Sequence, residues 1–316
     1  MRGRRILGVT LALGSLTWVC APGIAQSPAG PRAPGAQPNR DQLTQPVYRV
    51  AQQPGEPAIV ANNTVPAPPD GNAAQPVAQP QQHPLEPALQ MAYAAMSNIR
   101  NNLKDYSCTM VKRERIGGKL NDPEYMYLKV RHEPFSVYMY FLGPERLRGQ
   151  EAIFVEGKNN GNLLGHGVGI RKIAGTVPLM PTGAMAMQGQ RYPITEIGML
   201  NLTKRLVEVA EMDKHFGECD VKFLRNAKII TGKEKRTVTC IQVVHPIPRK
   251  NFRFHRAMVY VDDELNLPVR YESYDWPDRP GGQPPLLEEY TYTDIKLNNG
   301  FTDLDFETTN PQYNFR

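Results

Sequence analysis

Cysteine and long apolar runs are scarce in this sequence of 316 residues, and both scarcities limit the kind of protein it encodes. Four cysteines are too few for a scaffold held together by disulfide bonds. The mean hydropathy is −0.46, and no apolar run approaches the roughly 20 residues that a membrane-spanning helix needs. The composition therefore excludes both a small disulfide-rich protein and a bundle of transmembrane helices.

The N-terminus has the features of an export signal. Three of the six net positive charges lie within the first five residues, followed by an apolar stretch over 6–19 and small residues over 21–25. A basic, an apolar and a small-residue region in this order are typical of a secretory signal peptide, residues 1–25. We predict cleavage after Ala25 and a location in the periplasm or cell envelope. Cys20 lacks the small residues before it that a lipoprotein signal has.

Residues 26–85 are dominated by proline, glutamine and alanine. Thirteen of these 60 residues are proline and ten are glutamine, and their acidic and basic charges cancel. Such a segment buries too little apolar surface to offset the entropy lost on ordering. It is predicted to be a disordered linker, either a spacer for the folded part or a tail without a role. The remaining net charge of +3 (6 − 3 from the signal) is too small to indicate a nucleic-acid partner.

Residues 86–316 are expected to form one domain of the α+β class. Apolar residues from Leu85 to Leu103 recur at spacings of three and four, which predicts a helix, and a similar face over 194–209 predicts a second. Elsewhere apolar and polar residues alternate with period two, without a regular strand–helix alternation, which favours an antiparallel sheet. Strands are expected near residues 106–115, 125–130, 135–141, 151–156, 162–165, 219–224, 227–230, 238–244, 252–262, 267–274, 287–297 and 304–306.

Several short motifs support a family resemblance. The apolar hairpin over 257–272, followed by 289–298 and 304–306, resembles the C-terminal half of the periplasmic lipoprotein-carrier superfamily, the LolA, LolB and RseB-like group. Most of the domain is also similar to a secreted bacterial family of unknown function. The marks of that similarity are Lys112-Arg113-Glu114-Arg115, Arg191-Tyr192-Pro193-Ile194-Thr195-Glu196, Val244-His245-Pro246 and Tyr274-Asp275-Trp276-Pro277.

The resemblance implies a curved antiparallel sheet in the form of an unclosed half-barrel, with helices on its concave side. It implies a cavity that holds a lipid, the acyl chains of a lipoprotein or another apolar ligand. Because few residues are spaced as in known catalytic motifs, we expect binding rather than enzymatic activity. The methionine-rich segment 179–187 is either a plain surface loop or a lid over this cavity, a role that methionine suits because it adapts to irregular space. The residues expected to line the cavity are Phe135, Val137, Met139, Phe141, Met180, Met185, Met187, Phe252 and Phe254.

Two other functions are compatible with the sequence. One is an envelope sensor or a structural module that binds an envelope protein without any ligand. The other, less favoured, is a secreted hydrolase that uses His245, His255 and Asp262. A basic run of Lys112, Arg113, Arg115 and Lys119 suggests peripheral contact with anionic headgroups, or simply the solvated end of a strand.

Neither a metal nor a cofactor is expected. No pair of histidines has the i, i+4 spacing of a zinc protease, and no serine stands in a G-x-S-x-G motif. Removal of the signal would leave Cys108, Cys219 and Cys240. In an oxidising compartment an odd count means one disulfide and a free thiol, an intermolecular bond, or no bond. Cys219 and Cys240 are the candidate pair because they are nearest in sequence.

Overall fold

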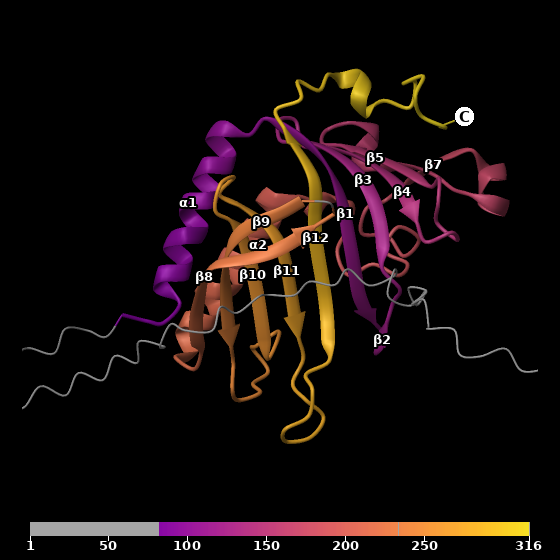
Figure 1. Cartoon of the computed structure of the whole chain (residues 1–316). Helices are drawn as coiled ribbons and strands as arrows, with labels where there is room; N and C mark the ends of the chain where they lie inside the picture. The colour runs from indigo at the N-terminus through magenta and orange to yellow at the C-terminus, as the bar shows by residue number, and fades with distance from the viewer. Residues whose placement is uncertain (1–81, 233, 316) are drawn as a thin grey trace, which may run out of the picture. The chain divides into compact units, whose positions relative to one another are not determined.

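The computed structural model describes residues 82–232 and 234–315, which form an antiparallel sheet of twelve strands and two α-helices (Figure 1). The sheet does not close, because β7 and β8 form its two ends in the order β7-β6-β5-β4-β3-β1-β12-β11-β10-β9-β8, with β2 paired to β1 alone. The predicted α+β class with an unclosed sheet is confirmed. The predicted signal peptide, its cleavage site after Ala25 and all of the linker up to residue 81 lie outside the described residues.

The first half of the domain is a helix followed by a meander of strands. Its elements are α1 (Glu86–Asn102), β1 (Asp105–Ile116), β2 (Lys119–Leu120), β3 (Glu124–Arg131), β4 (Ser136–Gly143), β5 (Glu151–Val155), β6 (Leu163–His166) and β7 (Thr176–Leu179).

The second half is a helix followed by a meander that returns to β1. Its elements are α2 (Met199–Asp213), β8 (Asp220–Thr231), β9 (Glu234–Val244), β10 (Arg256–Asp262), β11 (Leu267–Tyr274) and β12 (Leu286–Leu297). β12 pairs with β1 from Tyr106 to Glu114, so β1 has a meander on each side and joins the two halves into one sheet.

Both helices lie on the concave side of the sheet. Of the positions expected to face inward, Leu85, Leu89, Ile99 and Leu103 are buried, whereas Ala92 and Met96 are half-buried. The first half of α1 packs against α2 around Leu89 and Val207, and α2 in turn packs on the sheet. The helices form one layer and the sheet the other, and side chains fill the space between α2 and the sheet only in part.

The two ends of α2 are attached to the sheet layer by polar contacts. At the first end, the Met199 N–H donates to the hydroxyl of Tyr106 on β1 over 3.0 Å. At the last end, Asp213 Oδ2 lies 3.3 Å from His245 Nε2, just after β9. Gly198 has φ +109° and a Cβ there would lie 2.9 Å from Tyr106 Oη, so glycine is required for this close approach.

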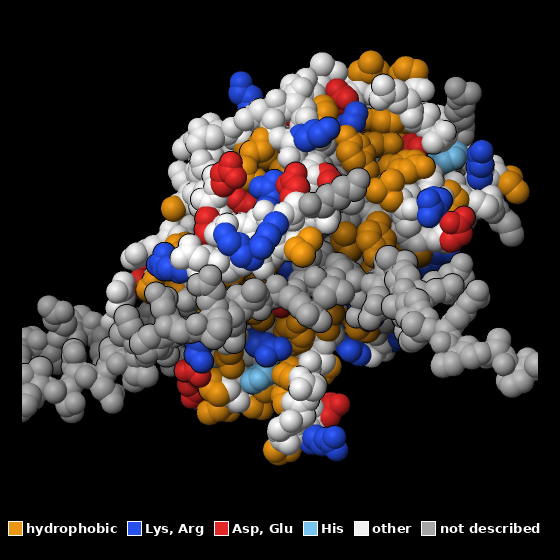
Figure 2. All heavy atoms as spheres, in the orientation of Figure 1, with side chains coloured by type: hydrophobic (Ala, Val, Ile, Leu, Met, Phe, Trp, Pro, Cys, Tyr) orange, Lys and Arg blue, Asp and Glu red, His pale blue; other side chains and the backbone are white. Residues whose placement is uncertain are grey.

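The opposite face of β3, β4 and β5 is covered by the C-terminal segment 301–315. Tyr313 stacks on Tyr138 at 3.8 Å between ring centroids, and Lys129 Nζ lies 2.7 Å from Asp305 Oδ1. Figure 2 shows hydrophobic side chains gathered over this part of the sheet, beside the C-terminal segment that Figure 1 places at its upper edge. The predicted alternation on 135–141 is correct, since Val137, Met139 and Phe141 face the helix side and Tyr138 and Tyr140 the other.

Three strand predictions differ from the structure. The strand expected from residue 252 begins at Arg256. Residues 304–306 belong to a 3₁₀ helix, Asp303–Phe306, because Thr302 and Asp305 form a reciprocal capping box at its start. The two strands expected over 219–230 are one strand, β8, interrupted by a bulge between Leu224 and Ala227. Among the described residues, none of the helices combines the length and apolar character needed to cross a membrane.

The attachment of α2 to Tyr106 can be tested by Tyr106→Phe. We expect the free energy of unfolding to fall by about 1–2 kcal/mol, because the buried Met199 N–H loses its acceptor. Chemical denaturation measures the change. Tyr93→Phe is the control, since this exposed tyrosine also loses one hydrogen bond, to Glu211, but in water. Equal losses in the two variants would contradict the proposed role of Tyr106.

Candidate functional site

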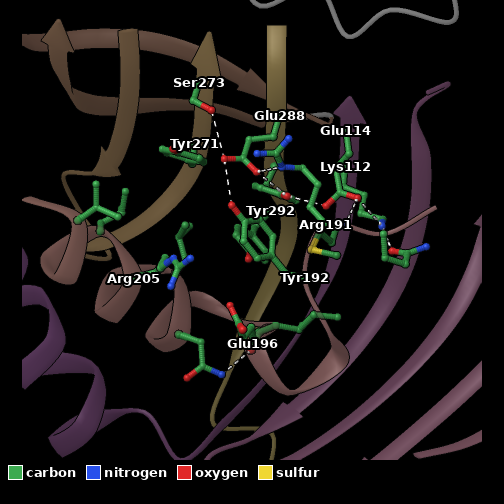
Figure 3. Close-up of a pocket in the computed structure, with 18 of the residues that line it drawn as sticks. Lys112, Glu114, Arg191, Tyr192, Glu196, Arg205, Tyr271, Ser273, Glu288 and Tyr292 are labelled. Carbon is green, nitrogen blue, oxygen red and sulfur yellow. Dashed lines mark hydrogen bonds and ion pairs between the residues drawn. The ribbon is translucent and has the colours of Figure 1, made fainter. Parts of the chain in front are cut away.

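A hollow of about 520 Å³ lies between the concave face of the sheet and α2 (Figure 3). Its floor is formed by β1, β3, β4, β11 and β12, its roof by α2, and its sides by the segments 190–197 and 253–254. This volume is within the range of small-molecule binding sites. The curvature of the sheet and the two end attachments of α2 together create this space.

The strand register places polar residues on the floor in two rows. In one row Lys112 on β1 is opposite Tyr290 on β12, which is opposite Tyr271 on β11. In the next row Glu114 is opposite Glu288, which is opposite Ser273. Directly opposite residues of antiparallel strands point to the same side, so both rows face the hollow.

Glu288 is the centre of a network of hydrogen bonds in these rows (Figure 3). Its carboxylate accepts hydrogen bonds from Ser273 Oγ at 3.2 Å, Tyr192 Oη at 3.3 Å and Tyr290 Oη at 3.1 Å. Burial, and then the charge of Glu288, raise the pKa of Tyr192 to about 12 and that of Tyr290 well above its usual value. Both tyrosines therefore keep their protons and act as hydrogen-bond donors to the carboxylates.

Two cations compensate the buried carboxylates. Lys112 Nζ lies 3.4 Å from Glu114 Oε2 and 3.3 Å from Glu124 Oε2, and it also donates to Gln190. Arg191 Nε lies 2.9 Å from Glu288 Oε2. Each of these buried charges therefore has a partner of opposite sign within the protein.

The remaining walls of the hollow are mostly apolar. They are formed by Met110, Met126, Met139, Ile197, Leu202, Leu206, Val209, Phe254 and Tyr292. Arg205, which is half-exposed, and Arg253, which is exposed, lie beside them. The hollow is thus polar along the rows of Lys112 and Glu114 and apolar along the row of Met110 and below α2. Such a two-sided cavity suits an amphiphilic molecule better than a purely polar or purely apolar one.

The residues predicted to line a cavity are distributed over several places. Met139 and Phe254 line the hollow, and Phe135 lines a smaller one of about 270 Å³ near His132. Val137 and Phe141 are packed in the core. Phe252 stacks on the ring of His245, at 3.9 Å between centroids. In the segment 179–187, considered as a surface loop or a lid, Met180 and Met185 are exposed by 63% and 70%, and Met187 is half-buried.

The two polar rows were not predicted from the sequence. From the sequence, Lys112 is expected to lie at a solvated strand end or against anionic headgroups. In the structure, Lys112 is only 6% exposed and Glu114 only 4%. Lys112 is therefore not available to a membrane surface. The period-two pattern already contained the signal, because Lys112 and Glu114 have the same parity as the buried Cys108 and Met110.

The histidine site considered for a hydrolase does not assemble. His245 is fully buried and pairs with Asp213, whereas Asp262 pairs with Arg236 at 3.0 Å. The His255 ring contacts the backbone oxygen of His245, at 2.9 Å. Within the described residues, no group of three or more histidine, cysteine or acidic side chains is placed to hold a metal ion.

The expected Cys219–Cys240 disulfide is absent from the structure. Cys108, Cys219 and Cys240 are all free and buried. Cys219 packs with residues of α1 and α2, whereas Cys240 packs between β8 and β10. Proximity in sequence did not bring the two sulfur atoms together, because the two residues belong to different clusters of the core.

An open antiparallel sheet that carries two helices over a hollow defines the class of this protein as an α+β half-barrel. The family model described as protein of unknown function (DUF1571) matches residues 103–315. The chain therefore belongs to the DUF1571 family, which confirms the predicted membership of a family of unknown function. No curated protein matches the chain.

Several solved structures are similar to this chain at low identity. The lipoprotein LppX of Mycobacterium tuberculosis is 13% identical over 69% of this chain and 98% of its own, with a TM-score of 0.37. A LolA superfamily protein of Nitrosomonas europaea is 12% identical over 69% and 97%, with a TM-score of 0.29. A chain of the Pseudomonas aeruginosa MucA/MucB complex is 14% identical over 70% and 60%, with a TM-score of 0.37.

The polar network makes a prediction for Glu288→Gln. We expect the free energy of unfolding to fall by about 2 kcal/mol, because the variant leaves the charge of Arg191 partly buried without its partner. Chemical denaturation measures it. The control is Glu145→Gln, whose ion pair with Arg148 is exposed and for which we expect little change. A loss for Glu288→Gln no larger than for the control would show that the network does not stabilise the fold.

The free cysteines make a second prediction. Burial raises the pKa of Cys219 to about 11 and that of Cys240 to about 12, and it also raises the pKa of Cys108. We expect iodoacetamide at pH 8 to leave all three thiols unmodified in the folded protein and to modify all three after denaturation without a reductant. Peptide mass spectrometry identifies the modified positions. Recovery of a Cys219–Cys240 linked peptide would contradict the structure.

Proposed function

We propose that the protein binds an amphiphile, such as a lipid or the acyl chain of a lipoprotein, in the hollow between the sheet and α2. One observation supports this proposal above the others. The hollow combines an apolar wall with a buried network of tyrosines, carboxylates and cations. A hydrocarbon chain can occupy the apolar side while the polar end of the molecule lies against the network.

The energetics favour a ligand with an apolar chain. Each buried methylene contributes about 0.8 kcal/mol, so a chain of moderate length supplies most of the binding free energy. A ligand without a polar group would cover Tyr192 and Glu288 with hydrocarbon. Both side chains would then lose hydrogen bonds to water without gaining any from the ligand, which costs free energy. A ligand without a chain would leave the wall of Leu202 and Met110 uncovered. An amphiphile avoids both costs.

We propose binding rather than catalysis, in the periplasm or cell envelope. The carboxylates and cations on the floor of the hollow hold one another in ion pairs, which is a structural arrangement rather than one poised for proton transfer. Export is inferred from residues 1–25 alone, and the linker from residue 26 is proposed to act as a tether.

A second candidate function is an interaction module for an envelope protein. Ile173, Met180 and Met185 are exposed by 87%, 63% and 70%, and they flank β7, which forms one end of the sheet. Exposed apolar side chains beside an unpaired strand edge are typical of protein contacts. In this function the hollow would remain without a ligand, and the contact surface would lie along β7.

The test uses the purified full chain. We expect organic extracts, analysed by mass spectrometry, to contain an acyl-chain molecule, and dansyl-undecanoate to bind with a rise in fluorescence. Leu202→Trp, which fills the hollow, should weaken this binding at least about tenfold, or 1.4 kcal/mol.

Met212→Trp is the matched control, because Met212 lies on the same helix but is 44% exposed. It should leave the affinity unchanged. Circular dichroism verifies that both variants keep the fold. Blank extracts together with no binding of dansyl-undecanoate by the unmodified chain would refute the proposed function, and a co-purified envelope protein would then favour the interaction module.

A further inference from the structure

A second hollow of about 180 Å³ lies between α1, α2 and the strands β9, β10 and β11. The side of α1 that faces it consists largely of alanines, including Ala88, Ala92 and Ala95, whose short side chains leave the space open. Its polar lining residues are Thr203, Asp213 and Asn266. Asp213 is engaged by His245, and the hydroxyl of Thr203 donates to the carbonyl of Met199. The second hollow is therefore almost entirely apolar.

The two hollows share part of their lining. Leu206, Val209 and Phe254 line both of them. Leu206 and Val209 are three residues apart on α2 and so lie on one side of that helix. This group of three apolar side chains therefore borders both hollows.

The same rows of the sheet form the floor of both hollows. The row of Lys112, Tyr290 and Tyr271 continues through Val259 on β10 to Ile241 on β9. The row of Glu114, Glu288 and Ser273 continues through Ala257 to Val243. Across the strands, from β1 to β9, each row changes from charged to fully apolar.

We propose that the two hollows are one binding site that takes a long-chain amphiphile lying across the strands. The polar end of the ligand lies at the polar side of the first hollow, beside Lys112 and Arg191, and the distal part of its chain passes Phe254 into the second hollow. This inference rests on the proposed function and adds to it the orientation of the ligand and a requirement for chain length.

Phe254 is suited to be the movable part of the group that borders both hollows. It precedes β10, so its backbone does not pair in the sheet. The ring nitrogen Nδ1 of His245 donates to the Phe254 carbonyl over 3.1 Å, and the rings of the two residues pack at 4.8 Å between centroids. In the proposed site the ligand chain reaches the second hollow when the Phe254 ring turns away from this position.

The experiment compares octanoate with palmitate by isothermal titration calorimetry on the full chain, below their micelle concentrations. For the unmodified chain, we expect Kd to fall by up to about fourfold for each added methylene. Ala92→Phe fills the second hollow alone. It should leave the octanoate Kd within about twofold and raise the palmitate Kd at least about tenfold.

The control is Ser97→Phe, since Ser97 is exposed on α1 and lines neither hollow; both affinities should be unchanged. If Ala92→Phe weakens both ligands equally, or neither, the inference is overturned while the proposed function stands. If the unmodified chain binds neither fatty acid, the proposed function fails and the inference fails with it.

A second measurement needs no variant. Palmitate with a photoreactive diazirine at its methyl end is crosslinked to the unmodified chain, and the labelled peptides are identified by mass spectrometry. We expect labels on residues 88–95, 241–243 or 257–261, which surround the second hollow. Labels confined to residues 110–114, 190–192 or 288–292 would place the chain end in the first hollow and overturn the inference.

Discussion

The hollow depends on the way α2 is held above the sheet, by polar contacts at its two ends and by bulky side chains between them. Tyr106 accepts the first amide of the helix, and His245 pairs with its last residue, Asp213. The Tyr106 contact is buried and is costly to break, because the Met199 N–H would lose its acceptor. Between them Leu202 and Leu206 meet the sheet only in part. A helix that packed along its whole length would have closed the space, whereas one attached at its ends preserves it.

Charged side chains such as those on the floor would destabilise an ordinary protein core, because burying an isolated charge costs several kcal/mol of folding free energy. Here every carboxylate in the rows has a cation or a tyrosine hydroxyl within contact distance, and Lys112 contacts two carboxylates. A fully paired network keeps the side chains in fixed positions. The floor is polar near β1 and apolar near β9. This asymmetry gives the cavity a direction, which a uniformly apolar cavity would lack.

The period of the apolar residues was enough to predict the sheet, the two helices and the facing of 135–141. It failed where a local interaction competes with the pattern. The alternation of Phe252 and Phe254 suggested a strand, but His245 packs against both rings and its Nδ1 bonds to the Phe254 carbonyl, which keeps this segment out of the sheet. The polar rows were missed for a different reason. Glu114 accepts a hydrogen bond from the hydroxyl of Tyr290, which lies 176 positions later in the chain. The pairing of β12 with β1 also brings Tyr290 opposite Lys112, and no local pattern reveals such a pairing.

The pairing of β1 with β12 also has a consequence for how the chain reaches its fold. β1 is the first strand and β12 the last, and the central contact of the sheet joins them. Contacts between segments this far apart in sequence slow folding, because a long loop must close before they form. Until β12 is available, β1 keeps an unpaired edge of up to twelve residues, which is a template for association with other chains. The edge of β1 is therefore covered only when β12 pairs with it. The chain is most prone to aggregate in the interval before this pairing forms.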